Sequence, residues 1–193
     1  DENIENFKKI LNFFKSFFLS NNIFFCIENH QDLHSEDILN IIYELGSDYI
    51  GINWDIGNSI SCCELPDSFY DKCKDFIKNI HLKDYIIVDN ESYISLVRCK
   101  FGEGFLKNFD IRKYLSLEVS RSLELGAQIS RKCYIYDEKY WQSNKMTNNK
   151  DSFINHIKSM STKNIIKSDY ENKLPYDDII SNERKDFDKS FEN

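Results

Sequence analysis

The sequence contains few residues that interrupt secondary structure, with 6 glycines and 2 prolines among its 193 residues. Its 6 cysteines form no CxxC pair and no regular framework, which favours reduced, structural thiols. A formal net charge of −7 argues against a nucleic-acid partner, since that would need a basic surface. The richest apolar stretch, residues 10–19, is interrupted by polar residues and is too short to span a bilayer. We therefore expect neither a nucleic acid nor a membrane among the partners.

The composition is that of a globular domain, because 41% of the residues are apolar and 15% are aromatic. No signal peptide is visible, so we expect a cytoplasmic protein. The chain opens on Asp1 without an initiator methionine, which suggests a fragment or a processed product.

Segments with strand and helix patterns alternate along the chain. Apolar residues at helical spacing predict a helix over 3–20. Ser35 as N-cap and Gly46 as C-cap mark the ends of a second helix. The other expected elements are strands over 23–27, 49–54, 77–83 and 121–126, helices over 66–77 and 109–118, and a hairpin over 85–99. This alternation predicts an α/β fold with a parallel sheet and right-handed crossovers.

Four of the predicted strands end in a side chain that can bind a metal ion, namely Glu28, Asp55, His81 and Glu124. The first three follow one another at about the length of one βα unit, roughly 30 residues. The step to Glu124 is longer because it contains the predicted hairpin. Parallel strands deliver their C-terminal ends to one face, so we expect the four side chains to converge. Three carboxylates and an imidazole suit Mn²⁺, Mg²⁺, Co²⁺ or Zn²⁺, and such an ion would relieve the repulsion between the carboxylates.

Each of these residues also has a purely structural interpretation. Glu28 alone would be a surface or capping residue, and Asp55 before Gly57 could form an Asx-turn. His81 could be a hydrogen-bonded core histidine, and Lys83 could form a local ion pair with its neighbour Asp84. These alternatives weaken because four such residues share the same position at a strand end.

The loops that follow the strands supply candidate substrate-binding residues: His30, Asn58, Lys83 and Glu103. His30 follows Glu28 closely, whereas we expect the nearby His34 to be exposed to solvent. Glu103 lies between Gly102 and Gly104, which allow a close backbone approach, so this loop is either a substrate loop or a plain turn.

Five segments together resemble the sugar phosphate isomerase/epimerase family of xylose isomerase-like (β/α)₈ barrels. That family is related to ketose 3-epimerases, inosose dehydratase and, distantly, endonuclease IV. The segments are Ile27–Asp32 (IENHQD), Asn53–Asn58 (NWDIGN), Ile80–Asp84 (IHLKD), Phe101–Gly104 (FGEG) and Ser122–Glu124 (SLE). The resemblance implies a divalent metal held by Glu28, Asp55, His81 and Glu124. It also implies that Glu28 and Glu124 act as acid and base on opposite faces of a sugar, through a metal-stabilised enediolate.

The sequence departs from the family at several positions. Ile56 stands where the family usually has threonine, and Lys100-Phe101 stands where it has Pro-Leu. The segment 125–128 lacks the expected polar residues. Because the helix before Glu124 is short, Glu118 competes with it as the fourth ligand. We prefer Glu124, because it keeps the sequence in register with the family at the downstream segment Glu138–Trp141 (EKYW), which also resembles the family.

Length is the largest departure, because a full barrel needs about 250 residues. The resemblance therefore implies that residues 1–141 form the last four βα units, the C-terminal half of a (β/α)₈ barrel. Residues 142–193 would be a polar, partly helical extension. The exposed sheet edges of a half-barrel predict self-association, a missing N-terminal half, or a loosely packed structure.

The leading hypothesis is a metal-dependent sugar or sugar phosphate isomerase or epimerase that abstracts a proton next to a carbonyl. The alternatives are a catalytically inactive barrel remnant or interaction module, an inosose dehydratase-like lyase, and, more weakly, a hydrolytic or endonuclease role.

Overall fold

The computed structural model describes residues 2–125, 130–143, 149–163 and 175–191. Its helices are α1 (Glu2–Ser20), α2 (Ser35–Leu45), α3 (Pro66–Cys73), α4 (Ile111–Leu115), α5 (Glu138–Ser143), α6 (Lys150–Met160) and α8 (Tyr176–Ser190). Its strands are β1 (Phe25–Glu28), β2 (Ile50–Asp55), β3 (Ile77–Leu82), β4 (Tyr85–Asp89), β5 (Ile94–Arg98), β6 (Ser120–Leu123) and β7 (Ser130–Cys133). Short 3₁₀ helices span Gly57–Cys62, Lys74–Phe76 and Phe105–Asn108.

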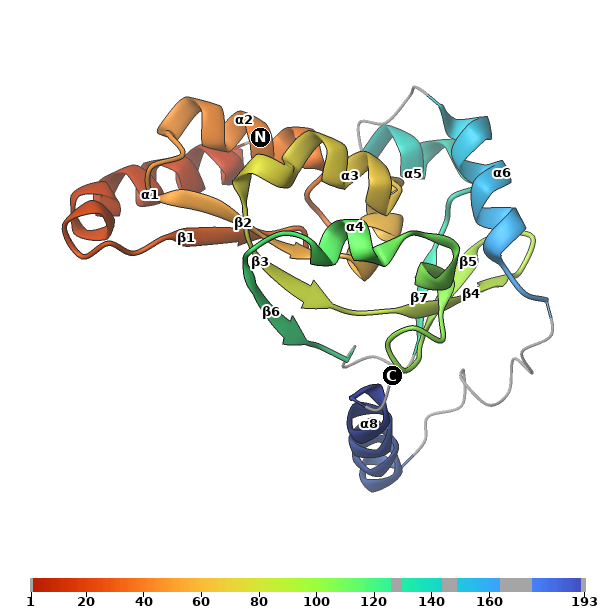
Figure 1. The fold of residues 1–193 in the computed structure, drawn as a ribbon. Helices are drawn as coiled ribbons and strands as arrows, with labels where there is room; N and C mark the ends of the chain where they lie inside the picture. Colours follow the sequence, from red (N-terminus) through yellow and green to blue (C-terminus); the bar gives the residue numbers. More distant parts are fainter. Residues whose placement is uncertain (1, 126–129, 144–148, 164–174, 192–193) are drawn as a thin grey trace.

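Four strands form a parallel sheet in the order β1-β2-β3-β6, which confirms the predicted α/β class and parallel pairing. The helices α1, α2 and α3 lie along one face of this sheet (Figure 1). The register aligns Glu28 with Asn53 and Asp55 with His81. The C-terminal ends of β2 and β3 therefore lie nearly level with each other, and β1 ends beside Asn53, before the end of β2.

The face of the sheet toward the helices is apolar and completely buried at its centre. Trp54 on β2 stacks on the ring of Phe69 in α3, with centroids 5.6 Å apart and planes 4° from parallel. The Tyr114 ring of α4 meets Trp54 edge-on, with centroids 4.9 Å apart. Ile80, the partner of Trp54 on β3, is also fully buried. Burial of these large side chains is the main force that holds the helices on the sheet.

The other face of the sheet carries polar side chains. One row across the strands consists of Glu28, Asn53, Asn79 and Ser120, and the next of Asp55, His81 and Ser122. Alternation along each strand places these residues opposite the apolar ones.

A second sheet has three antiparallel strands in the order β4-β5-β7. The β4–β5 hairpin was predicted, whereas β7 and its pairing with β5 were not. The helices α6 and α8 lie in the part of the chain that was expected to be polar and partly helical, and Phe153 and Ile157 of α6 are buried. The division of the chain at residue 141 stays a prediction.

The structure corrects two details near α2. The N-cap of this helix is His34, whose side chain accepts a hydrogen bond from the Glu36 N–H, while Ser35 is the first helical residue. His34 was expected to be exposed but is only 5% exposed. Gly46 is the C-cap, as predicted, with φ of 105° and its N–H bonded to the Ile42 carbonyl. Two boundaries also differ: α3 ends at Cys73, and the helix expected over 109–118 is reduced to Ile111–Leu115.

The β1 side of the sheet carries large apolar side chains that remain accessible. On α1, Phe13 is 81% exposed and Phe17 is 54% exposed, and Phe24 just before β1 is 42% exposed. Within the described residues, β1 and β6 are the two edges of the four-stranded sheet. No helix in the described residues is long and apolar enough to cross a membrane.

Candidate metal centre

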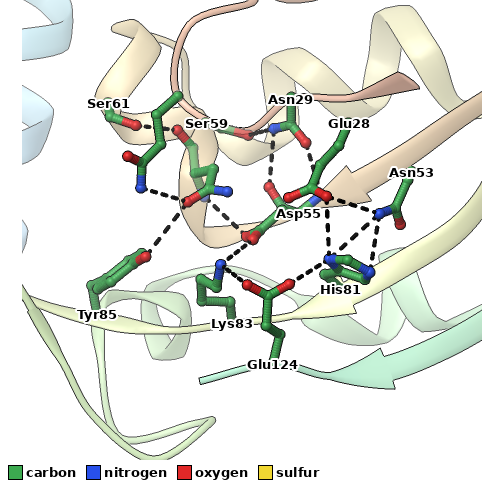
Figure 2. A network of polar contacts seen from close by, with 12 residues as sticks. Glu28, Asn29, Asn53, Asp55, Ser59, Ser61, His81, Lys83, Tyr85 and Glu124 are labelled. Atoms are coloured by element: carbon green, nitrogen blue, oxygen red, sulfur yellow. Dashed lines mark hydrogen bonds and ion pairs between the residues drawn. The ribbon is translucent and has the colours of Figure 1, made fainter. Parts of the chain in front are cut away.

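The four strand-end residues come together on the polar side of the sheet (Figure 2). Glu28, Asp55, His81 and Glu124 each offer one ligand atom, and these atoms all lie within 4.8 Å of one another. Glu118 is exposed in the segment before β6 and is not part of this group. Of the two glutamates considered for the fourth position, the fold therefore brings Glu124 to the cluster.

His81 lies between the two glutamates. Its Nδ1 is 2.6 Å from Glu124 Oε2 and 3.8 Å from Glu28 Oε2. The Asn53 side-chain amide is 3.0 Å from Nε2 on the same ring. The imidazole therefore contacts the proposed ligands directly and is not packed into the apolar core.

Asp55 is the most buried member of the cluster and is fully inaccessible to solvent. Its Oδ1 accepts a hydrogen bond from the Asn58 N–H at 3.2 Å, the Asx-type turn considered from the sequence. Its Oδ2 meets the ammonium of Lys83 as an ion pair at 2.6 Å but accepts no bond with hydrogen-bond geometry. Burial raises the pKa of Asp55 to about 6, although the positive charge of Lys83 opposes the shift.

Lys83 does not pair with its neighbour Asp84, so the local ion pair considered from the sequence is wrong. Its Nζ instead lies 2.6 Å from Asp55 Oδ2 and 2.5 Å from Glu124 Oε1. Burial alone would lower the pKa of Lys83. The charge of Asp55 and the close contacts of the ammonium with both carboxylates nevertheless hold this pKa above its ordinary value. The ammonium is therefore part of the cluster itself.

Two asparagines hold the proposed ligands in place, and sequence reasoning did not single them out. Asn29 bonds both sides of the Asp55 backbone, accepting from its N–H at 2.7 Å and donating to its carbonyl at 3.0 Å. Asn53 donates to Glu28 Oε2 at 3.2 Å and accepts from the Asn79 side chain at 2.7 Å. The signal available in the sequence was an amide next to Glu28 and another inside an apolar strand.

Asp84 fixes the loop that contains Glu103. Its buried carboxylate accepts hydrogen bonds from the backbone N–H groups of Gly102, Gly104 and Leu106 at 3.0, 2.8 and 3.2 Å. A Cβ at Gly104 would lie 2.3 Å from Asp84 Oδ1, which explains the glycine. Glu103 itself is exposed and pairs with Lys100 at 3.0 Å.

Three other predicted substrate-binding residues lie in different surroundings. His30 is exposed just beyond β1. Asn58 is fully buried, and its Oδ1 accepts from Gln31 at 3.2 Å and from the Tyr85 hydroxyl at 3.5 Å. Lys83 is bound to two proposed ligands, as described above. Substrate contact by any of these residues, or by Glu103, stays a prediction.

The residues present fit a divalent cation. Three carboxylates and one imidazole are a common donor set for Mn²⁺, Mg²⁺, Co²⁺ and Zn²⁺. Asp55 Oδ2 is buried and directed into the cluster, and the Lys83 ammonium that lies 2.6 Å from it shows that this position can be occupied by a positive charge. The cluster therefore has the chemistry of a divalent cation site.

Comparison with other proteins gives distant similarities. The chain is 25% identical over 87 residues to the 3-oxo-isoapionate decarboxylase of Pectobacterium atrosepticum, covering 44% of this chain and 32% of that protein. It is 28% identical over 80 residues to the uncharacterized protein YihM of Escherichia coli K12, covering 42% of this chain and 24% of that protein. The chain thus matches a third or less of the length of these relatives. No protein-family model matches it, and neither does any solved structure.

Proposed function

We propose that Glu28, Asp55, His81 and Glu124 bind a divalent cation and that the chain is the metal-carrying half of a (β/α)₈ barrel. In this proposal the complete protein is a sugar or sugar phosphate isomerase or epimerase. The observation that carries the proposal is the meeting of four potential ligands from four parallel strands within 4.8 Å. Distant similarity to a decarboxylase supports a sugar-processing enzyme in general terms.

The exposure of the four side chains suggests which of them bind the cation and which also act on the substrate. Asp55 is inaccessible, and the His81 side chain is 18% exposed, which suits residues that only hold a cation. Glu28 and Glu124 have side chains that are 28% and 37% exposed, so both can reach a substrate. A bound cation would polarise a sugar carbonyl and acidify the neighbouring C–H bond. One glutamate would then take that proton, and the other would return a proton from the opposite face.

The open sheet edges and the exposed aromatic side chains of α1 support a partner that completes the barrel. This partner would be either a missing N-terminal half or a second copy of the chain. Because all four proposed ligands lie in this chain, cation binding would not need the partner, whereas a closed substrate pocket would. The six free cysteines are consistent with a reducing compartment and support the proposal of a cytoplasmic location.

Metal content and metal affinity test the cation site. We expect the chain to retain Mn²⁺ or Co²⁺ after dialysis and expect His81→Ala to bind at least about tenfold more weakly. His156→Ala is a matched control, because His156 is an exposed histidine on α6. Equal, negligible metal in the wild type and in His81→Ala would refute the proposal.

Proton exchange tests the chemistry. With Mn²⁺ added, we expect deuterium from solvent to enter ketoses at the carbon next to the carbonyl, and Glu28→Gln and Glu124→Gln to abolish this exchange. Binding of metal without any exchange, in the protein whose barrel is completed by its partner, would favour the inactive remnant or interaction module.

A lyase is a second candidate, because one relative is named as a decarboxylase. The same cation could polarise a carbonyl that is separated by one carbon from a carboxylate, so that the carboxylate leaves as CO₂ and the resulting enolate takes up a proton at that carbon. Release of CO₂ from a 3-oxo sugar acid, without isomerisation of ketoses, would favour this alternative.

A further inference from the structure

The ammonium of Lys83 lies where it can neutralise the proposed metal ligands. It is 2.6 Å from Asp55 Oδ2 and 2.5 Å from Glu124 Oε1, so it bridges carboxylates from two different strand ends (Figure 2). Lys83 is only 3% exposed, which keeps its charge close to these two groups. Without this lysine, three carboxylates would face one another with little positive charge to balance their negative charges.

The backbone of Lys83 is fixed on both sides, so the side chain starts from a defined point. A Cβ at Gly57 would lie 2.8 Å from the Lys83 carbonyl oxygen, which shows how closely the β2 turn packs there. The carboxylate of the next residue, Asp84, accepts hydrogen bonds from the backbone N–H groups of the 102–106 loop. Movement of the ammonium must therefore come from rotation of the four-carbon side chain.

A divalent ion and the ammonium would compete for the same oxygens. An ion bound by Asp55 and Glu124 would lie within a few ångströms of Nζ, and like charges at that distance repel strongly when solvent is largely excluded. Occupancy by metal therefore requires the Lys83 ammonium to turn away from at least one carboxylate. The lysine stabilises the metal-free arrangement and lowers the affinity for metal.

We propose that Lys83 is a built-in cation that holds Asp55 and Glu124 together without metal and competes with a divalent ion for them. This inference rests on the proposed cation site and assigns Lys83 a positioning role in addition to any contact with substrate. The site would then have two states, one in which the Lys83 ammonium binds Asp55 and Glu124 and one in which a divalent ion binds them.

Mn²⁺ titration and thermal unfolding with and without EDTA test this proposal on wild type and Lys83→Met, which keeps a long side chain without the charge. We expect Lys83→Met to bind Mn²⁺ at least about tenfold more tightly. Its metal-free form should melt at a lower temperature than the wild type, and added Mn²⁺ should raise its melting temperature more. The control is Lys72→Met, which removes a lysine paired with the buried Glu64 outside the cluster. It should lower the melting temperature without changing the Mn²⁺ affinity.

The outcomes separate this proposal from the proposed function. If the wild type binds Mn²⁺ and Lys83→Met binds it equally or more weakly, the competition is refuted while the cation site stands. If only Lys83→Met binds, the competition is supported, but the wild-type chain is not a metal protein by itself. If neither binds, both proposals fail. Lys83→Gln, examined by circular dichroism and titrated in the same way, replaces the methionine variant if that one does not fold.

Discussion

Two polar clusters in this molecule contain similar residues but differ in how their charges are balanced. The first is the candidate metal centre, formed by Glu28, Asp55, His81 and Glu124 with Lys83. The second ties α2 to the start of α3 and consists of His34, Ser35, Glu64, Ser68 and Lys72.

In the second cluster the Glu64 carboxylate is saturated with donors. It accepts from the Ser35 hydroxyl at 2.6 Å, the Ser35 N–H at 3.2 Å and Lys72 at 3.2 Å, with Ser68 at 3.4 Å. The His34 Nε2 lies 3.4 Å from the same group. A single buried carboxylate with several hydrogen-bond donors connects the two helices, and it needs no further ligand.

In the first cluster acceptors outnumber donors. Three carboxylates share one lysine, one imidazole and two amide donors, from the Asn53 side chain and the Asn58 backbone. The buried Asp55 has its pKa raised to about 6, chiefly by burial. The contrast teaches that burial and charge alone do not mark a binding site. A binding site is indicated instead by an excess of hydrogen-bond acceptors that point at a common position.

Removing the charge of Glu64 should produce the largest change in stability. We expect Glu64→Gln to lower the free energy of unfolding by about 3 kcal/mol, because it leaves Lys72 without its buried partner and turns an amide toward existing donors. Urea denaturation measures this change. Affinity for Mn²⁺ should stay at the wild-type value, so a parallel loss of metal binding would contradict the separation of the two clusters.

Glu28→Gln is the matched variant in the candidate metal centre. Its amide oxygen can still accept from Asn53, and one repelling charge is removed, so we expect metal-free stability within about 0.5 kcal/mol of the wild type. Affinity for Mn²⁺ should fall by at least about tenfold, measured by calorimetric titration. A destabilisation as large as that of Glu64→Gln would show that Glu28 is a structural residue instead.

The smallest expected effect is a pH dependence that originates from His34. Burial lowers its pKa below the ordinary value of 6.5, while the Glu64 charge opposes this, Lys72 lowers it further, and Glu36 and Asp37 raise it. The unfolded chain therefore takes up a proton at this residue first as the pH falls, and stability decreases from pH 6.5 down to the folded-state pKa.

His34→Asn should remove this contribution while keeping an N-cap that accepts from the Glu36 N–H. We expect the stability difference between about pH 7.5 and about pH 5 to be smaller in the variant than in the wild type, measured by urea denaturation in both buffers. Equal pH slopes for the two proteins would contradict the assignment.

Much of the fold could be predicted from local patterns. Apolar runs located β1, β2 and β3, and the helical spacing of Ile4, Phe7 and Leu11 located α1. These patterns are readable because burial repeats with a period of two in strands and 3.6 in helices. The strand β7 was missed because its residues, Ser130–Cys133, are mostly polar and are strand only through pairing with β5.

The candidate site likewise contains residues that could be predicted from the sequence and residues that could not. Glu28, Asp55, His81 and Glu124 could be found because each ends an apolar segment, and parallel pairing brings such ends together. Asn29, Asn53 and the bridging position of Lys83 could not be found, because these contacts join residues about 25 to 41 positions apart in the chain.

The sequence by itself determined the alternation of strands and helices and the four side chains at the strand ends, since both follow from local order along the chain. Only the tertiary structure decided that His34 is buried and that Lys83 lies between two carboxylates. These outcomes depend on the distance between strands and on how far solvent is excluded. Both quantities arise only when the parallel sheet is assembled under its helices.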